Sequence, residues 1–231
     1  MDCWARWLLE RRFGGDRTQL ERTLEHLRPV RDRVIAGARI ESGDVVLDVG
    51  AGDGLIGFAA LERVGDAGRV IFSDISDDLL DVCRELAHGD PRTQFVHASA
   101  DELESIADES VDVVTTRSVL IYVKDKERAF REFFRVLRPG GRLSIFEPIN
   151  RWYRETRPET EFWGFEASPV ADLVEKLIAA YEADEPPEQS PLLDFDERDL
   201  MRLARAAGFE VLRLEYEASV KIGRASCRER V

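Results

Sequence analysis

The sequence predicts an α/β fold: a doubly wound parallel sheet with helices on both faces, three layers in all. Short β-rich runs alternate with helical patterns after Gly37, which is typical of a parallel sheet flanked by helices. The first run ends in a glycine-rich turn, residues 50–54, and the second ends in an acid, Asp74. A chain of 231 residues is long enough for one sizeable domain and argues weakly against two.

Two helical segments precede the predicted sheet, at about residues 3–12 and 16–36. Phe13-Gly14-Gly15 separates them, and Pro29 is a candidate kink in the second. We expect residues 1–40 to form a helical lid.

Six segments are expected to be strands because they are short, rich in β-branched and aliphatic residues, and bounded by turn residues. They are residues 44–49, 69–74, 93–97, 111–116, 141–147 and 209–219. The clearest helix precedes the fifth strand, where four large apolar residues recur at helical spacing. These are Phe130, Phe133, Phe134 and Leu137. Pro139-Gly140-Gly141 is expected to end that helix and lead into the strand.

Residues 148–195 interrupt the alternation of strands and helices and read as an insertion after the fifth strand. Five aromatic residues lie in its first part: Trp152, Tyr153, Phe162, Trp163 and Phe165. Ser168-Pro169 predicts the start of a helix that reaches about Tyr181. A polar, proline-rich connection, residues 185–191, follows it.

The last eleven residues, 221–231, resemble a translated sequencing adapter, whose reading frame gives Lys-Ile-Gly-Arg-Ala-Ser-Cys-Arg-Glu-Arg-Val in order. We therefore treat them as a non-native tail. The natural protein is expected to continue beyond Val220, so that the chain is truncated at its C-terminus.

The chain is strongly acidic, with a net charge of −13. The tail contributes four basic residues and one acidic residue, which leaves −16 for residues 1–220. A general nucleic-acid-binding protein needs a cationic surface to displace phosphate counterions. The charge therefore argues against nucleic acid as a partner.

Cysteine content and hydropathy indicate the compartment. Outside the tail only Cys3 and Cys83 occur, which suits a reducing compartment and supports neither a disulfide framework nor a thiolate metal site. No apolar run approaches the length of about 18 residues that a transmembrane helix needs. We expect a soluble, cytoplasmic protein with no membrane partner and no metal.

The stretch Val45–Gly54 runs from an apolar strand into the glycine turn, with Asp48 two residues before the first glycine. Glycine lets the backbone bend sharply and approach a ligand closely, and a helix can begin directly after the turn. Residues 52–57 also match the dinucleotide fingerprint. Asp74 can accept hydrogen bonds from the ribose hydroxyls of a dinucleotide or of another cofactor that contains a ribose. The turn alone thus predicts a nucleotide-type pocket and leaves its cofactor open.

Downstream motifs separate the two interpretations. In chain order they are Asp48 with Gly50-Ala51-Gly52-Asp53-Gly54, Asp74-Ile75-Ser76, Ser99-Ala100-Asp101, and Val136-Leu137-Arg138-Pro139-Gly140-Gly141. Over about residues 41–216 this series resembles a class I S-adenosylmethionine-dependent methyltransferase of Rossmann-like fold. The resemblance implies a seven-stranded sheet in the order 3-2-1-4-5-7-6, with the seventh strand antiparallel. Residues 41–220 would form this domain, without the seventh strand. The alternatives are an NAD-dependent oxidoreductase and a non-catalytic S-adenosylmethionine-binding module.

The resemblance also assigns residues to the cofactor, S-adenosylmethionine. They are Asp48, Gly50, Ala51, Gly52, Gly54, Asp74, Ile75, Ser99, Ala100 and Arg117. Asp48 would brace the turn and face the methionine ammonium, Asp74 would bind the ribose, and Ile75 would pack on the adenine. The family often has an acid where Ser99 stands, and Asp101 is the candidate to replace it.

Open α/β sheets bind ligands beyond the carboxyl ends of their strands. This edge, and the insertion that follows it, nominate residues for a small-molecule acceptor that is methylated on oxygen, carbon or nitrogen: Tyr122, Glu147, Trp152, Phe162 and Trp163. Orientation alone can supply about 7–11 kcal/mol of the acceleration, so no catalytic residue is assigned. Trp4 and Trp7 share one face of the first helix. They predict packing or, as the alternative, an indole that faces the sulfonium.

Overall fold

The computed structural model describes residues 1–11, 17–156, 161–162, 165–187 and 189–215. Its strands are β1 (Val45–Val49), β2 (Arg69–Asp74), β3 (Thr93–His97), β4 (Val111–Arg117), β5 (Leu137–Phe146), β6 (Glu161–Phe162) and β7 (Phe165–Glu166). Its helices are α1 (Cys3–Arg6), η1 (Trp7–Arg11, a π-helix), α2 (Arg17–Ala38), α3 (Leu55–Leu61), α4 (Asp77–Leu86), η2 (Leu120–Tyr122), α5 (Lys126–Val136), α6 (Asn150–Thr156), η3 (Ser168–Val170), α7 (Ala171–Asp184) and α8 (Glu197–Ala207).

Five parallel strands form the central sheet in the order β3-β2-β1-β4-β5. This order confirms the α/β fold and the first five positions of the expected sheet. β1 lies in the middle, and all five of its residues are buried. A parallel strand with both faces covered reads as a continuous apolar run, which explains why β1 was evident in the sequence.

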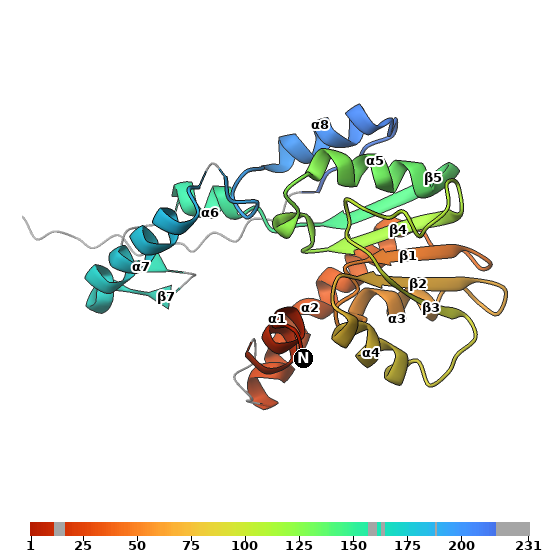
Figure 1. Ribbon diagram of the computed structural model, residues 1–231, viewed down its shortest axis with the longest axis horizontal. Helices are drawn as coiled ribbons and strands as arrows, with labels where there is room; N and C mark the ends of the chain where they lie inside the picture. The colour runs from red at the N-terminus through yellow and green to blue at the C-terminus, as the bar shows by residue number, and fades with distance from the viewer. Residues whose placement is uncertain (12–16, 157–160, 163–164, 188, 216–231) are drawn as a thin grey trace, which may run out of the picture.

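Helices cover both faces of the sheet and complete the three layers (Figure 1). On one face α2, α3 and α4 bury residues such as Ile35, Ile56 and Leu80 against the sheet. On the other face α5 and α8 bury Phe130, Phe133 and Leu203. Alternate residues of one strand serve the two faces, because successive side chains of a strand point to opposite sides. The chain therefore builds two apolar layers from one set of strands.

The helix before the fifth strand is confirmed, but its end differs from the expectation. α5 stops at Val136, and β5 already begins at Leu137. The pairing with β4 shifts between Val111, opposite Leu137, and Val113, opposite Arg142. The Pro-Gly-Gly segment lies within this irregularity, where a positive φ of 81° at Gly140 suits a residue without a Cβ.

The sixth predicted strand, 209–219, is wrong for its described part, since residues 209–215 adopt no strand. Phe209 packs edge-on against Phe134 of α5 with 5.3 Å between ring centroids, whereas Val211 is 97% exposed. An apolar pattern becomes a strand only where a neighbouring strand pairs with it. Residues 216–219 and the tail at 221–231 lie outside the described residues.

The expected lid divides into two parts in the structure. The last turns of α2 belong to the core, where Val34, Ile35 and Ala38 are buried, and the Ser144 hydroxyl of β5 donates to the Val34 carbonyl at 2.8 Å. α1 and η1 lie apart from the sheet faces, beside α4, and the first turns of α2 also lie away from the sheet (Figure 1). The lid hypothesis therefore excludes the last turns of α2.

The insertion at 148–195, which we call the arm, leaves the carboxyl end of β5. In Figure 1, α7 and β7 extend away from the sheet, and Arg154 of α6 donates to Glu182 of α7 at 2.7 Å. The returning chain is fixed by Lys126, whose buried ammonium donates to the Val123 and Pro191 carbonyls and to Asp194 at 2.6–3.0 Å. The root of the arm is thus tied to the start of α5.

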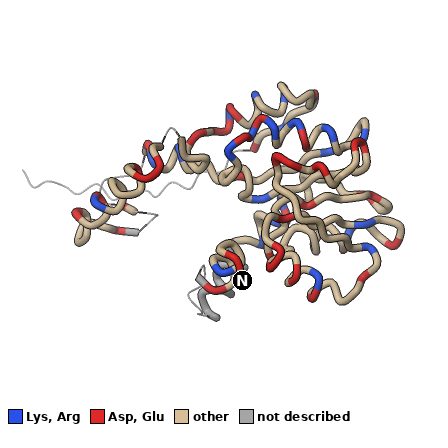
Figure 2. The backbone as a smooth tube through the Cα atoms, viewed as in Figure 1, with Lys and Arg blue, Asp and Glu red and all other residues tan. Residues whose placement is uncertain are grey.

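No helix among the described residues has both the length and the apolar content to cross a membrane. In Figure 2 acidic and basic residues are interspersed along the described chain, as on α5 and α8. The argument against nucleic acid still rests on net charge and remains a prediction.

Candidate functional site

The glycine turn links β1 to α3 through backbone conformations that favour glycine. Gly50, Gly52 and Gly54 have φ of 66°, 56° and 85°. A Cβ at Gly50 would lie 2.3 Å from Cγ2 of Val119, whereas a Cβ at Gly52 would meet only Leu8, at 3.3 Å. The turn therefore presents bare backbone to the loop after β4 on one side and to η1 on the other.

Cys83 lies beneath the same turn and is not a reactive thiol. Its Sγ contacts the Gly52 carbonyl at 3.4 Å, and burial raises the pKa of Cys83 to about 12. A buried thiol in such surroundings is a small apolar residue. Cys83 supports the turn from below.

Asp74 ends β2 and holds the turn from the neighbouring strand. Its carboxylate accepts the Gly52 N–H at 2.9 Å with one oxygen and the Ser76 N–H at 2.9 Å with the other. Burial raises the pKa of Asp74, although the hydrogen bonds from these two N–H groups lower it. A carboxylate has about four acceptor positions, so each oxygen can accept a further donor. The predicted ribose acid is thus already oriented by its own backbone partners.

Asp48 is the most deeply buried acid of the site, with 1% of its surface exposed. One oxygen accepts from the Thr115 hydroxyl at 2.9 Å, and the other, Oδ2, has no hydrogen-bond partner among the described residues. Burial raises the pKa of Asp48 to about 7, although the Thr115 hydrogen bond, the nearby Gly57 N–H and the charge of Arg117 lower it. A buried polar atom without a partner is costly and is therefore a candidate ligand contact.

The segment after β3, which carries Ser99 and Ala100, is fixed next to Asp74. The Ala98 N–H donates to the Asp74 carbonyl at 3.1 Å, and the Ser99 hydroxyl donates to Asp101. Ser99 and its substitute acid are therefore partners of each other. Ile75 is exposed beside them, as a residue that packs on a ligand ring would be.

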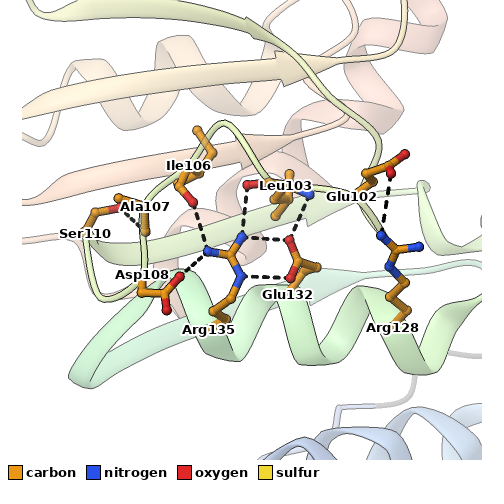
Figure 3. Close-up of polar contacts among 9 residues, drawn as sticks. All are labelled: Glu102, Leu103, Ile106, Ala107, Asp108, Ser110, Arg128, Glu132 and Arg135. Carbon is orange, nitrogen blue, oxygen red and sulfur yellow. Dashed lines mark hydrogen bonds and ion pairs between the residues drawn. The ribbon is translucent and has the colours of Figure 1, made fainter.

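Arg135 of α5 clamps the rest of this segment in place (Figure 3). Its guanidinium donates to the Leu103 and Ile106 carbonyls at 2.9 Å and to Glu132, and Glu132 in turn accepts the Leu103 N–H at 2.9 Å. The Arg135 hydrogen bond lowers the pKa of Glu132. Charge-assisted hydrogen bonds of this kind are strong, so the crossover from β3 to β4 has a defined shape.

Glu147, one residue after β5, faces the loop that follows β4. Its carboxylate accepts the N–H groups of Val119 at 2.9 Å, Leu120 at 3.0 Å and Ile121 at 3.3 Å. Burial raises the pKa of Glu147 to about 7, although these three N–H groups lower it. Arg151 and Arg154, the nearest arginines that follow Glu147 in the chain, pair instead with Glu155 and Glu182. The hydrogen bonds direct the carboxylate at backbone rather than at an open acceptor face.

Arg117 and Tyr122 flank Glu147 on the β4 side. Arg117 is the last residue of β4, and its positive charge lowers the pKa of both Asp48 and Glu147. Tyr122 ends η2, and its ring lies edge-on to Trp4 of α1 with 5.0 Å between centroids. The structure thus brings these two nominated residues to the edge where β1, β4 and β5 end.

The N-terminal helix meets the cofactor residues through Asp2 and Ser76. Asp2 caps α1 by accepting the Trp4 and Ala5 N–H groups at 2.9 Å, and the Ser76 hydroxyl donates to Asp2 at 2.6 Å. Ala5 and Leu8 pack with Leu79 of α4. Trp4 therefore takes part in packing, as the simpler of the two sequence interpretations holds.

Two of the nominated residues of the arm lie in its short elements α6 and β6. Trp152 is exposed on α6, and Phe162 lies in β6, which pairs with β7. Trp163 lies outside the described residues. Their role toward an acceptor stays a prediction.

The two histidines whose side chains the structure describes, His88 and His97, make no described contact at the edge where β4 and β5 end. His97 ends β3 and pairs with Asp77 at 3.1 Å, and His88 occupies a turn with φ of 50°. The described residues contain no group of three or more potential metal ligands. Among the described residues, the edge offers oriented backbone, carboxylates, the Arg117 guanidinium and the Tyr122 phenol.

Sequence reasoning missed three participants: Thr115, Ser76 as a link, and Lys126. Thr115 could have been predicted from the alignment of neighbouring strands, because β1 and β4 pair Asp48 with Thr115. Ser76 was quoted only as part of a motif, and its link to Asp2 joins residues 74 positions apart. No local feature of the sequence indicated that Lys126 is buried, since a lysine at the start of a helix usually lies in solvent.

Comparison with known proteins agrees with this geometry. The methyltransferase domain family matches residues 47–145, from β1 into β5. The ubiquinone/menaquinone biosynthesis C-methyltransferase UbiE of Cronobacter sakazakii is 32% identical over 182 residues, covering 74% of this chain and 68% of the relative. The protein of the same name from Vibrio campbellii is 40% identical over 115 residues, covering 48% of this chain and 43% of the relative.

Among solved structures, the YcgJ protein of Bacillus subtilis superimposes with a TM-score of 0.56 at 22% identity, covering 78% of this chain and 68% of that one. This likeness concerns the fold alone. The sequence match to the Cronobacter protein carries further, because it keeps 32% identity over 182 residues and covers 68% of that relative. The chain therefore belongs to the class I S-adenosylmethionine-dependent methyltransferases.

Proposed function

We propose that this chain transfers the methyl group of S-adenosylmethionine to a carbon atom of a small aromatic acceptor of the quinol class. The observation that carries the proposal is the extended identity to C-methyltransferases whose names place them in ubiquinone and menaquinone biosynthesis. A ring carbon next to a phenolic oxygen is a nucleophile, so the acceptor chemistry suits a methyl donor. Oxygen or nitrogen acceptors are the alternatives that the assay must compare.

The residues of the site fit S-adenosylmethionine. Asp48 offers a buried carboxylate oxygen without a described partner, which suits the methionine ammonium directly or through water. Asp74 has free acceptor positions for the ribose hydroxyls, and Gly52 presents backbone without a side chain. When bound, the cofactor supplies an activated methyl group on sulfur. The residues of the chain would bind and orient it.

The proposal assigns no general base. A positioned base adds about 10²–10⁴-fold, but orientation of two reactants can contribute more. The edge formed by the ends of β1, β4 and β5 supplies orientation through Asp48, Arg117 and the backbone of η2. The non-catalytic alternative would require binding of the cofactor without turnover of any acceptor.

Asp74→Ala should weaken binding of S-adenosylhomocysteine by about 1.5–3 kcal/mol, the range for hydrogen bonds to a charged acceptor. Calorimetric titration of the parent and the variant measures the difference. Asp81→Ala is the matched control, because Asp81 lies in α4, directly after the strand that Asp74 ends, and its carboxylate pairs with Arg84 at the surface. Equal affinity of parent and Asp74→Ala would remove the ribose assignment, and binding of NAD by the parent would favour the oxidoreductase.

Trp152→Ala should raise the Michaelis constant for the acceptor and leave the affinity for S-adenosylhomocysteine within about twofold. Removal of an aromatic wall costs acceptor contact area but no cofactor contact. Tyr181→Ala, on the exposed far part of the arm, is the control and should change neither constant. A variant that loses cofactor affinity and keeps acceptor kinetics would refute the placement of Trp152.

A further inference from the structure

The loop between β4 and α5, residues 118–122, begins with an unusual backbone conformation. Ser118 has a φ of 56°, in the left-handed region that non-glycine residues rarely adopt. Its N–H donates to the Phe146 carbonyl at 2.8 Å, so the loop begins by pairing with the last residue of β5. Such a conformation persists only where surrounding contacts determine it.

Glu147 supplies those contacts for the next three residues. The N–H groups of Val119, Leu120 and Ile121 open η2, where no intrahelical acceptor is available, and all three donate to the Glu147 carboxylate within 3.3 Å. A single carboxylate thus serves as the cap of η2 from a different strand. Its three hydrogen bonds are charge-assisted, and they fix orientation as well as distance.

The same loop touches the glycine turn at one end and the N-terminal helix at the other. Val119 approaches Gly50 so closely that a Cβ there would lie 2.3 Å from its Cγ2. Tyr122, three residues later, meets the Trp4 ring at 5.0 Å. A shift of η2 would therefore move both neighbours of the cofactor site.

We propose that Glu147 is a positioning residue for methyl transfer: its carboxylate fixes residues 118–122, and through Val119 and Tyr122 it sets the glycine turn and the N-terminal helix around the cofactor. The inference rests on the proposed function for its meaning in catalysis, but its structural part needs only the chain. It differs from a role of Glu147 as a direct acceptor contact. Since Glu147 immediately precedes the arm, the same residue links the acceptor side to the cofactor side.

The test compares Glu147→Gln with the parent chain by amide hydrogen exchange. Glutamine keeps the size of the side chain and one carbonyl oxygen, but its NH₂ group cannot accept the third N–H. We expect faster exchange at residues 119–121 and, more weakly, at residues 50–52, with the amides of β1 and β2 unchanged. Glu155→Gln, which removes the surface partner of Arg151, should leave the whole pattern unchanged.

Two further readouts separate positioning from acceptor contact. The dissociation constant of S-adenosylhomocysteine should rise several-fold in Glu147→Gln, and turnover of 1,4-naphthohydroquinone should lose about 10–100-fold in kcat, the effect of a small misplacement, at unchanged KM. Unchanged exchange at residues 119–121, or a raised KM with unchanged kcat, would overturn the proposal. If the parent turns over no quinol, the proposed acceptor fails, and the exchange and affinity data still decide the positioning role.

Discussion

Asp48→Asn is expected to stabilise the folded chain at pH 8 by about 2–4 kcal/mol, even though it alters the centre of the site. A shift of one pKa unit corresponds to about 1.4 kcal/mol, and burial raises the pKa of Asp48 from 3.8 to about 7. At pH 8 the folded chain must therefore hold a buried negative charge that the unfolded chain exposes to water. Asparagine keeps the shape of the side chain and removes that charge.

The sign of the pH dependence follows from proton binding. The folded chain binds the Asp48 proton more tightly, so its stability relative to the unfolded chain falls as the pH rises from about 4 to about 7 and is level above. Asparagine does not titrate. The stabilisation by Asp48→Asn should therefore be near zero at pH 4 and complete by pH 8, as urea unfolding at a series of pH values can measure.

Asp90→Asn is the control with the opposite sign. The Arg92 hydrogen bond lowers the pKa of Asp90 to about 2, so this carboxylate contributes stability above about pH 4 that is lost as the pH falls toward 2. Asp90→Asn should destabilise the chain at pH 8. If Asp48→Asn also destabilises it there, the charge of Asp48 is compensated in the folded chain, and the argument from its unpartnered oxygen fails.

The gain in stability should come with a loss of function. If the Asp48 carboxylate faces the methionine ammonium, the neutral variant loses a charge-assisted contact, and its affinity for S-adenosylhomocysteine should fall. Sites that bind ligands often hold groups that destabilise the free protein. A stabilised variant with weakened binding would identify Asp48 as such a group.

Gly50→Ala is expected to destabilise the fold by about 2–5 kcal/mol. The left-handed conformation costs a residue with a Cβ about 1–2 kcal/mol, and an overpacked site adds about 1–3 kcal/mol. The overpacking arises because the new Cβ would lie 2.3 Å from Cγ2 of Val119. The hydrogen bond from the Val119 N–H to Glu147 resists a shift of the Val119 backbone that would relieve this contact.

Gly89→Ala separates the two contributions. Gly89 has a similar φ of 76°, and a Cβ there would meet no atom within 4 Å. It should show only the conformational cost of about 1–2 kcal/mol. Equal unfolding free energies for the two variants would mean that the turn and the loop at 118–122 are not in close contact.

The sequence was sufficient for those parts of the fold that are encoded locally. Buried parallel strands such as β1 are mostly apolar, and an acid or a glycine lies at or near their ends, so Asp48, Gly50 and Asp74 could be placed at one edge. The strand expected at 209–219 failed in its described part for the converse reason. The alternating apolar residues of this segment specify one apolar face, but only a neighbouring strand can supply the backbone hydrogen bonds of a sheet.

Side-chain direction accounts for the rest of the difference. The position of Glu147 at the end of a strand predicted a carboxylate at the ligand edge. The three N–H groups that donate to it are brought together only once η2 has formed. The burial of Lys126 likewise depends on the return of the arm, 65 to 68 residues later in the chain. Contacts between distant segments decide both side chains, and no local pattern carries them.

The most direct test of the account is a crystal structure of the chain with S-adenosylhomocysteine. We expect the ribose hydroxyls on Asp74, the adenine beside Ile75, and the amino acid portion over Gly50 and Gly52 with its ammonium toward Asp48. The sulfur should face the edge that carries Arg117 and η2. A ligand bound elsewhere, or one whose ribose makes no hydrogen bond to Asp74, would contradict the assignment of this edge as the cofactor site.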